Sequence, residues 1–328
     1  MEVIILGSGG AIPVKERNLP AIALRLESSP ELFIFDCGED IQRRFIEAGL
    51  KLNKPLTIFI THFHGDHING LPGLLFRFSL IERSAPLMIF GPKNIFYYLY
   101  FHRKIVGLKA SYPITIVEID DENDKLIFFD NLDSEQPIKE EKIENNIILE
   151  KRKYLIKYTP VVHSILTYGY SFIEKPRNGK FNPEIATKMG IPRGYLWKNL
   201  QEGLEIEFKG NKINPEKEGI VGPKRPGRKV TYSGDTIPCD SLIQLGLDSD
   251  LLIHEATYSN KLTSIAIEKK HSTSVDAAND AIKMRAKQLI LTHVSSRYQY
   301  DASELLLEAK EIFPNTILAE DLLKITLK

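Results

Sequence analysis

The stretch "THFHGDHING", residues 61–70, places three histidines and one aspartate within six consecutive positions. In an extended turn His62 and His64 can point one way while Asp66 and His67 point elsewhere, so each pair could hold one of two adjacent metal ions. A polar turn whose side chains bond each other or water is the alternative. The density of ligand types favours a metal centre over that turn.

The elements that must position this cluster form an α/β pattern. "EVIIL", "AIALRLE" and "LFIFDC" are typical of strands, a helix is predicted over 40–50, and "LTIFI", residues 56–60, is typical of a strand buried on both faces. The cluster begins where that strand ends. Ligand sites in α/β folds favour this edge of a sheet.

Further ligand types follow other predicted strands. His163 follows "YTPVV", Asp235 lies in "VTYSGDT", and His254 and His293 end "DLLIH" and "QLILTH". Helices are predicted near 274–286 and 302–312. Zinc binds imidazole nitrogen and carboxylate oxygen, so these groups could complete a two-metal site at one sheet edge.

Composition narrows the classes of protein. The 328 residues are 43% hydrophobic, and 43 basic side chains balance 43 acidic ones, so no global charge draws the chain to nucleic acid or a membrane. The start lacks the pattern of a secretory signal, and no apolar run could cross a bilayer. With only Cys37 and Cys239, a cytoplasmic protein without disulfides or thiolate metal sites is expected.

One segment departs from this neutrality. Residues 174–229 contain 13 Lys and Arg, 7 Glu and no Asp, a local balance of +6, with many Gly and Pro. Such a basic insertion could neutralise phosphates and stack on bases, although a disordered solvated loop has the same composition. The candidate contacts are Lys175, Arg177, Lys180, Arg193, Tyr195, Trp197 and Lys198. Residues 120–146, rich in acids and amides, predict a solvated excursion around one short strand.

Several motifs together carry a family resemblance. "THFHGDH", His163, "SGDT" and "THVSSRY" resemble the metallo-β-lactamase superfamily. More narrowly, "GSGGAIPVKERN", "FDCGEDIQRR", "SGDTIPC", "HEATY", "HSTS" and "LTHVSSRY" occur in the order of the ribonuclease Z family, endonucleases that trim precursor tRNA 3′ ends. The first motif alone fits hydrolases of many substrates. The later motifs narrow the choice.

The resemblance implies a fold and a set of partners. The fold would be a single αββα sandwich, two mixed sheets face to face with helices outside, in which residues 174–229 form an inserted flexible arm that binds tRNA. The chain would act as a homodimer without membrane contact. It would cut precursor tRNA after the discriminator nucleotide and leave a tRNA 3′-hydroxyl and a 5′-phosphate on the trailer.

The same resemblance implies a role for each ligand type. Two Zn²⁺ ions per subunit would be bound, the first by His62, His64 and His163, the second by Asp66, His67 and His293, with Asp235 bridging both. Asp66 would also accept a proton from the attacking water.

His271, in "KKHSTS", is the candidate general acid, and Glu255 could bond its other ring nitrogen and favour its protonated form. A plain N-cap or core histidine is the alternative for His271. Capping suffices to explain Ser272, Thr273 and Ser274. Arg297 and Tyr298 could grip a phosphate or stack on a base, with a surface salt bridge as the alternative. His254 is expected to be structural and His102 a surface group.

Two other functions share these residues. Another dinuclear zinc hydrolase, such as a cyclic-nucleotide or aryl-ester phosphodiesterase, would use the same metals without the arm. A non-catalytic RNA-binding protein with a decayed metal site is the second alternative, and the complete ligand set counts against it.

Overall fold

The computed structural model describes residues 1–327, and the chain divides into two compact units. The core unit comprises residues 1–150, 156–172 and the chain from Lys229 onward. The arm unit comprises Lys151–Leu155 and Ile173–Arg228. The second range lies within one residue of the basic insertion delimited from the sequence.

The first sheet of the core unit has nine strands, with β4 to β7 parallel and the outer pairs antiparallel. In spatial order these are β20 (Lys324–Thr326), β1 (Glu2–Gly7), β3 (Ala21–Arg25), β4 (Leu32–Phe35), β5 (Leu56–Phe59), β6 (Leu87–Pro92), β7 (Ile114–Asp120), β8 (Lys125–Asp130) and β9 (Lys139–Lys142).

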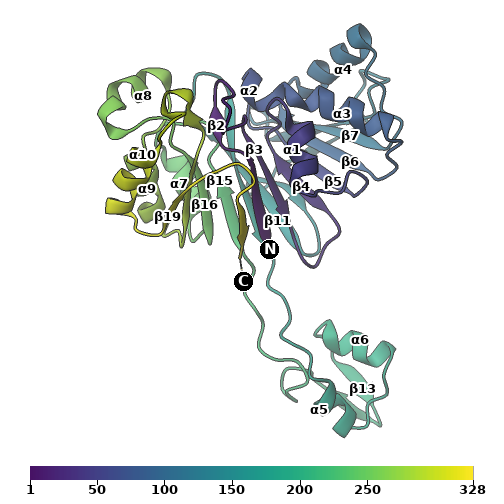
Figure 1. Cartoon of the computed structure of the whole chain (residues 1–328). Helices are drawn as coiled ribbons and strands as arrows, with labels where there is room; N and C mark the ends of the chain where they lie inside the picture. Colours follow the sequence, from purple (N-terminus) through teal and green to yellow (C-terminus); the bar gives the residue numbers. More distant parts are fainter. Residues whose placement is uncertain (328) are drawn as a thin grey trace. The chain divides into compact units, whose positions relative to one another are not determined.

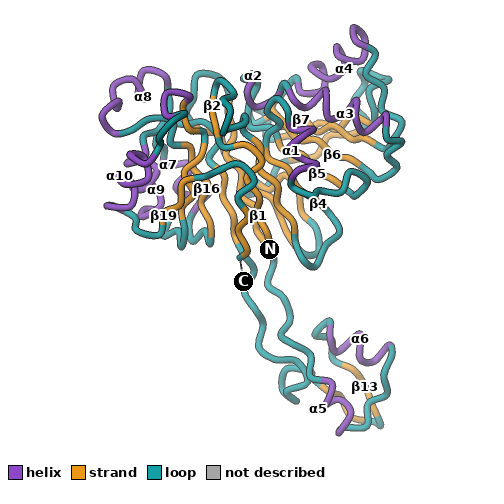
Figure 2. The backbone as a smooth tube through the Cα atoms, in the orientation of Figure 1, coloured by secondary structure: helices purple, strands orange, loops and turns teal. Residues whose placement is uncertain are grey.

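The second sheet has seven strands, and its last four are parallel. Figure 2 shows the strands in orange. In spatial order these are β10 (Ile147–Glu150), β11 (Tyr154–Val161), β12 (Thr167–Glu174), β15 (Lys229–Tyr232), β16 (Leu251–Glu255), β17 (Leu289–Thr292) and β19 (Thr316–Leu318).

Side chains alternate between the two faces of each sheet, which builds four layers. In the first sheet Ile34 and Ile58 pack in one cluster with helix residues such as Phe45. On the other face the ring of Phe59 stacks on Phe35 at 5.2 Å and contacts Tyr170 of the second sheet at 5.5 Å. The expected αββα sandwich of metallo-β-lactamase type is therefore confirmed.

Helices cover both outer faces (Figure 1). Against the first sheet lie α1 (Ile41–Glu47), α3 (Gly70–Leu80) and α4 (Ile95–Val106); against the second lie α7 (Asp240–Gly246), α9 (Ser274–Lys283) and α10 (Ser303–Ile312). The helix predicted over 40–50 is shorter because Gly49 adopts a positive φ of 70°. Four smaller elements also belong to this unit: β2 (Gly9–Gly10), which pairs with β18 (Val294–Ser295), α2 (Gly65–Ile68) and α8 (Thr263–Lys269).

The acidic segment 120–146 differs from its prediction. It forms two strands, β8 and β9, rather than one strand in a solvated excursion. Phe128 and Phe129 of β8 are buried, whereas all four residues of β9 are exposed. An exposed edge strand needs no apolar alternation, so composition alone does not reveal it.

The arm unit is folded, in contrast to the irregular loop that its composition allows. It contains α5 (Pro183–Lys188), α6 (Tyr195–Gln201) and a hairpin of β13 (Ile206–Phe208) and β14 (Asn211–Ile213). Lys209 and Gly210 both have positive φ, as a two-residue hairpin turn requires. The core of this unit consists of Ala186, Ile191, Leu200, Ile206, Ile213 and Ile220. Helices this short carry too few apolar positions to show a helical period.

No helix within residues 1–327 is long and apolar enough to cross a bilayer.

Candidate metal centre

The end of β5 delivers the clustered ligands. After Phe59 the chain runs without helix to His64, and α2 begins at Gly65. His62 and His64 therefore precede the helix, whereas Asp66 and His67 lie in its first turn. This change of backbone conformation separates the two pairs, as the spacing predicted.

Other strand ends bring the remaining ligands to the same edge. His163, Asp235 and His293 follow β11, β15 and β17 respectively. Gly10 packs so closely on His293 that an added Cβ would lie 2.3 Å from ring atom Cε1. The glycine-rich segment that contains Gly10 therefore packs tightly against the site.

These side chains form one buried cluster. Their potential ligand atoms group as His62, His64, His163 and Asp235, and as Asp66, His67 and His293, with all atoms in a group within 4.8 Å of one another. Asp235 lies between the groups: its Oδ2 is 3.8 Å from Nε2 of His62 and 3.2 Å from Nε2 of His293. A third group joins Asp235, His271 and His293.

Unsatisfied polar atoms test whether the cluster fits a metal. Nε2 of His62, Nε2 of His67 and Oδ1 of Asp235 are buried and have no hydrogen-bond partner among the described residues. A buried polar atom without a partner is costly, and imidazole nitrogen with carboxylate oxygen is a donor set for a divalent transition metal. The residues therefore fit a divalent metal centre.

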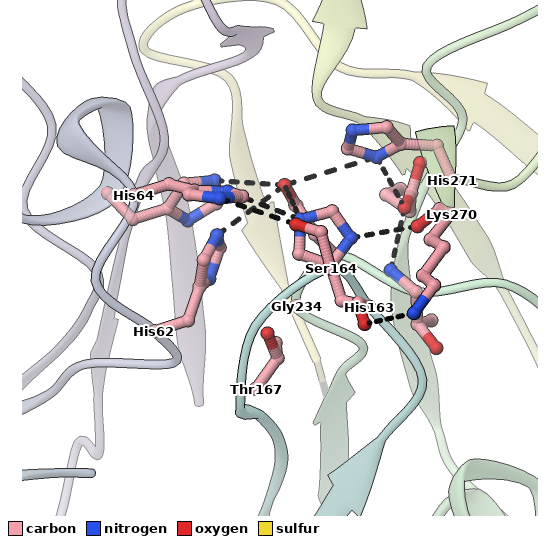
Figure 3. Close-up of polar contacts among 12 residues, drawn as sticks. His62, His64, His163, Ser164, Thr167, Gly234, Lys270 and His271 are labelled. Atoms are coloured by element: carbon pink, nitrogen blue, oxygen red, sulfur yellow. Dashed lines mark hydrogen bonds and ion pairs between the residues drawn. The ribbon is translucent and has the colours of Figure 1, made fainter. Parts of the chain in front are cut away.

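The opposite ring nitrogen of four histidines is held by a neighbour at 2.8 Å. The partners of Nδ1 are Thr61 Oγ1 for His62, Asp36 Oδ2 for His67, the Lys270 carbonyl for His163 and Thr257 Oγ1 for His293. Such partners orient metal-ligating imidazoles. His64 differs, because its Nδ1 lies 3.2 Å from His163 Nε2 while Ser164 approaches its Nε2 (Figure 3).

The sequence did not single out these supporting residues. Asp36 lies in "FDCGED" and Thr257 in "HEATY", two motifs of the family resemblance in which neither residue was given a role. Asp36 is fully buried and has a positive φ of 59°, which is unusual for a residue other than glycine. This backbone conformation marks Asp36 as a special position, but it is visible in the structure and not in the sequence.

Electrostatics match the ligand roles of His62, His163 and Asp235, whereas at His67 burial would lower the pKa but the carboxylates of Asp235 and Asp36 raise it. Burial lowers the pKa of His62 and His163, which favours the neutral imidazole that a metal requires. Burial would raise the pKa of Asp235, but the neighbouring His293 and His67 outweigh it and hold that pKa well below the usual range. Asp235 is thus a carboxylate at neutral pH.

His271 lies between α8 and α9 and pairs with Glu255. Its Nδ1 is 2.9 Å from Glu255 Oε1 and 4.0 Å from Asp235 Oδ2. Burial alone would lower the pKa of His271, but the carboxylates of Glu255 and then Asp235 outweigh burial and raise that pKa to about 9. The helix cap is a different residue, Thr273, which forms a capping box with Asp276. The N-cap alternative for His271 is therefore wrong.

Two open hollows adjoin the cluster. One, of about 510 Å³, is lined by Asp66, Asp235, His271 and His293 together with polar and apolar neighbours such as Glu39 and Ile12. The other, of about 400 Å³, is lined by His64, His163 and His271 with the exposed Lys269 and Lys270. His64 and His271 border both, so a chain-like substrate could cross the metal centre.

The remaining predicted residues lie outside the cluster. Arg297 is exposed, with its guanidinium 5.1 Å from the ring of Tyr258, and the Tyr298 hydroxyl accepts the Ser259 N–H at 2.9 Å. His254 is buried, contacts the Glu255 carbonyl and lies 3.6 Å from Asp280, so it is structural as expected.

The predicted arm contacts belong to the separate arm unit. Arg193 is exposed and lies over the ring of Trp197 at 5.2 Å, and Lys180 and Lys198 are exposed. Arg177 is half-buried and pairs with Glu174 at 3.2 Å, while Lys175 is also half-buried. Of these five residues, Lys180, Arg193 and Lys198 are the better candidates for contact with a polyanion because their side chains are exposed.

Comparison with known proteins agrees with this architecture. A structure of the human tRNase Z, short form, is 27% identical with a TM-score of 0.66, and each chain covers 100% of the other. The metallo-β-lactamase fold protein YhfI from Bacillus subtilis, 17% identical over 99% of both chains with a TM-score of 0.62, shares the fold. Fold and site together define a metallo-β-lactamase superfamily protein with a metal centre at the sheet edge.

Sequence relatives narrow the class. Proteins named Ribonuclease Z from Methanosarcina mazei and Prochlorococcus marinus (strain MIT 9515) are 35% and 36% identical, covering 99% and 100% of this chain and 97% and 100% of their own lengths. The chain belongs to the ribonuclease Z family. Residues 1–153 also match the family model described as anti-Pycsar protein Apyc1.

Proposed function

We propose that this chain is the endoribonuclease that cuts precursor tRNA just after the discriminator nucleotide, in tRNA 3′-end maturation. The observation that carries the proposal is the cluster of seven histidine and aspartate side chains beside the His271–Glu255 pair. Ribonuclease Z relatives along the full chain support the substrate. Cleavage of an end-labelled precursor tRNA, with the cut mapped to the nucleotide, tests it directly.

The chain's own residues would divide the work of hydrolysis. Bound zinc would supply Lewis acidity and lower the pKa of the attacking water. Asp66, whose Oδ2 is fixed by the Ala11 N–H at 2.7 Å, would accept a proton from that water. His271, protonated through its pairing with Glu255, would give a proton to the 3′-oxygen as the bond from phosphorus to that oxygen breaks. The products would be a tRNA 3′-hydroxyl and a 5′-phosphate on the trailer.

We propose two Zn²⁺ per subunit, held by the two ligand groups with Asp235 shared between them. Chelator-treated protein should take up two equivalents of Zn²⁺ and regain activity, and its melting temperature should rise because the metal binds only the folded state. Elemental analysis and calorimetric titration measure this. One equivalent, or none, would contradict the proposed stoichiometry, and none would favour the non-catalytic alternative.

The arm unit is proposed as the tRNA-binding exosite. Lys180 and Gly222 are joined by a backbone hydrogen bond of 3.1 Å, so residues 181–221 can be replaced by two glycines with little strain on the chain ends. We expect the deletion variant to lose at least about tenfold in kcat/KM on precursor tRNA, chiefly through KM, because phosphate contacts are lost. Hydrolysis of bis(p-nitrophenyl) phosphate, which is too small to need an exosite, should be unchanged and serves as the control.

Undiminished tRNA cleavage by this deletion variant would contradict the substrate assignment. It would favour the other candidate, a zinc phosphodiesterase of small substrates such as cyclic nucleotides or aryl esters.

We also propose a homodimer in the cytoplasm. Helix α4 carries Tyr97, Phe101 and Ile105 four residues apart, so they share one helix face, and they are 36%, 55% and 79% exposed. A second copy could cover this apolar stripe. Phe101→Glu with Ile105→Glu should shift the mass measured by light scattering from dimer to monomer. Ile267→Glu on α8, 64% exposed, should not, and equal masses for all variants would exclude the α4 interface.

A further inference from the structure

Two threonine hydroxyls occupy equivalent positions beside the metal centre. Thr61 lies between Asp36 and His62: its Oγ1 is 3.0 Å from both oxygens of the carboxylate and 2.8 Å from Nδ1 of the ring. Thr257 lies between Glu255 and His293, with distances of 2.6 and 2.8 Å. All six residues that make these contacts are at least 95% buried. Each arrangement is a hydrogen-bonded triad of carboxylate, threonine and histidine.

The number of available protons fixes the direction of the hydrogen bonds in the first triad. An ionised carboxylate can only accept hydrogen bonds, and Asp36 accepts them from the Thr61 N–H and the Tyr232 hydroxyl as well. The single hydroxyl proton of Thr61 therefore goes to Asp36. Its oxygen must then accept from Nδ1–H of His62. The lone pair of His62 remains on Nε2, the buried atom that lacks a partner within the described chain.

The same proton count applies to the second triad. Glu255 accepts the Thr236 N–H and the His271 ring at Oε1, and the Thr257 hydroxyl at Oε2. Thr257 thus accepts from Nδ1–H of His293. The lone pair on Nε2 is then available to a cation held together with Oδ2 of Asp66, 3.3 Å away, and Oδ2 of Asp235, 3.2 Å away.

The fold brings the members of the two triads together in different ways. Thr61 directly precedes His62 in sequence. Thr257 is brought to His293 by the parallel pairing of β16 and β17, in which Glu255 lies opposite Thr292. The same arrangement arising by two routes indicates a shared requirement rather than one local turn.

We propose that Thr61 and Thr257 are positioning residues that hold His62 and His293 in the Nδ1–H tautomer, one ligand in each metal group. His67 and His163 need no threonine, because Asp36 and the Lys270 carbonyl bond their Nδ1 atoms directly. Thr257 and His271 both bond Glu255, so the second triad connects the metal ligand His293 to the proposed general acid. This inference rests on the proposed metal centre and not on the proposed RNA substrate.

Nitrogen-15 NMR of histidine-labelled, zinc-loaded protein tests the tautomers without any substitution. Two-bond correlations should show Nδ1–H for His62 and His293 in the wild type. Nε2–H at both rings would overturn the proposal even if no variant can be made. Because RNA cleavage does not enter this measurement, its result and that of the proposed function can be told apart.

Variants extend the test to metal affinity. Thr61→Val and Thr257→Val keep the side-chain shape but remove the hydroxyl, and each should weaken one of the two Zn²⁺ binding steps by about 10- to 100-fold in chelator competition. Thr61→Ser and Thr257→Ser should restore the affinity. Thr231→Val is the matched control, since the buried Thr231 hydroxyl forms hydrogen bonds with Ser171 and Ser249, away from the cluster. Zn²⁺ affinities unchanged from wild type, or lowered equally in the control, would overturn the proposal.

Discussion

Replacing Asp235 by alanine should reduce precursor tRNA cleavage on the order of 10³-fold or more, because metal ions supply several kcal/mol of transition-state stabilisation and each 1.4 kcal/mol is about tenfold in rate. Its Oδ2 lies 3.2 to 4.0 Å from nitrogens of five histidines, so its removal affects both ligand groups at once. Single-turnover cleavage and the bound Zn²⁺ content should be measured on the same samples.

A matched control separates this effect from a general loss of charge. Asp133→Ala removes an exposed carboxylate that pairs with Arg103, and its cleavage rate should equal that of wild type. Retention of both zinc ions and of wild-type cleavage in Asp235→Ala would contradict the shared-ligand role.

Glu255→Gln should shift the basic limb of the pH–rate profile to lower pH. His271 must be protonated to act as an acid, and in the wild type the pKa of His271 is raised to about 9, so the acid form persists through neutral pH and is lost as pH rises past that value. Without the Glu255 charge, burial lowers the pKa of His271. The variant should lose on the order of 100-fold at pH 8, the contribution of one general acid, and less at pH 6.

The profile itself distinguishes this mechanism from structural damage. A misfolded site would lose activity by the same factor at every pH, whereas loss of the tuning charge steepens the fall toward high pH. Glu268→Gln, an exposed carboxylate paired with Lys269 beside the same hollow, should leave the profile unchanged at equal metal content. An unshifted basic limb in Glu255→Gln would exclude Glu255 as the residue that tunes His271.

The sequence by itself predicted the features that rest on local patterns. Apolar alternation located the main strands, and the strand end at residue 60 placed His62, His64, Asp66 and His67 at a sheet edge. Charge counting delimited the basic segment within one residue of the arm unit. These predictions succeed because strand periodicity, helix starts and charge density depend only on neighbouring residues.

The tertiary structure decided which distant groups meet. It set Asp235 at the centre of the cluster, Asp36 against His67 and Thr257 against His293, pairs separated by 31 and 36 positions. It also showed an arm with its own apolar core where composition allowed disorder. Such contacts follow from sheet order and strand register, which the chain specifies only through the packing of the whole fold, because no local pattern states which strand end will lie beside another.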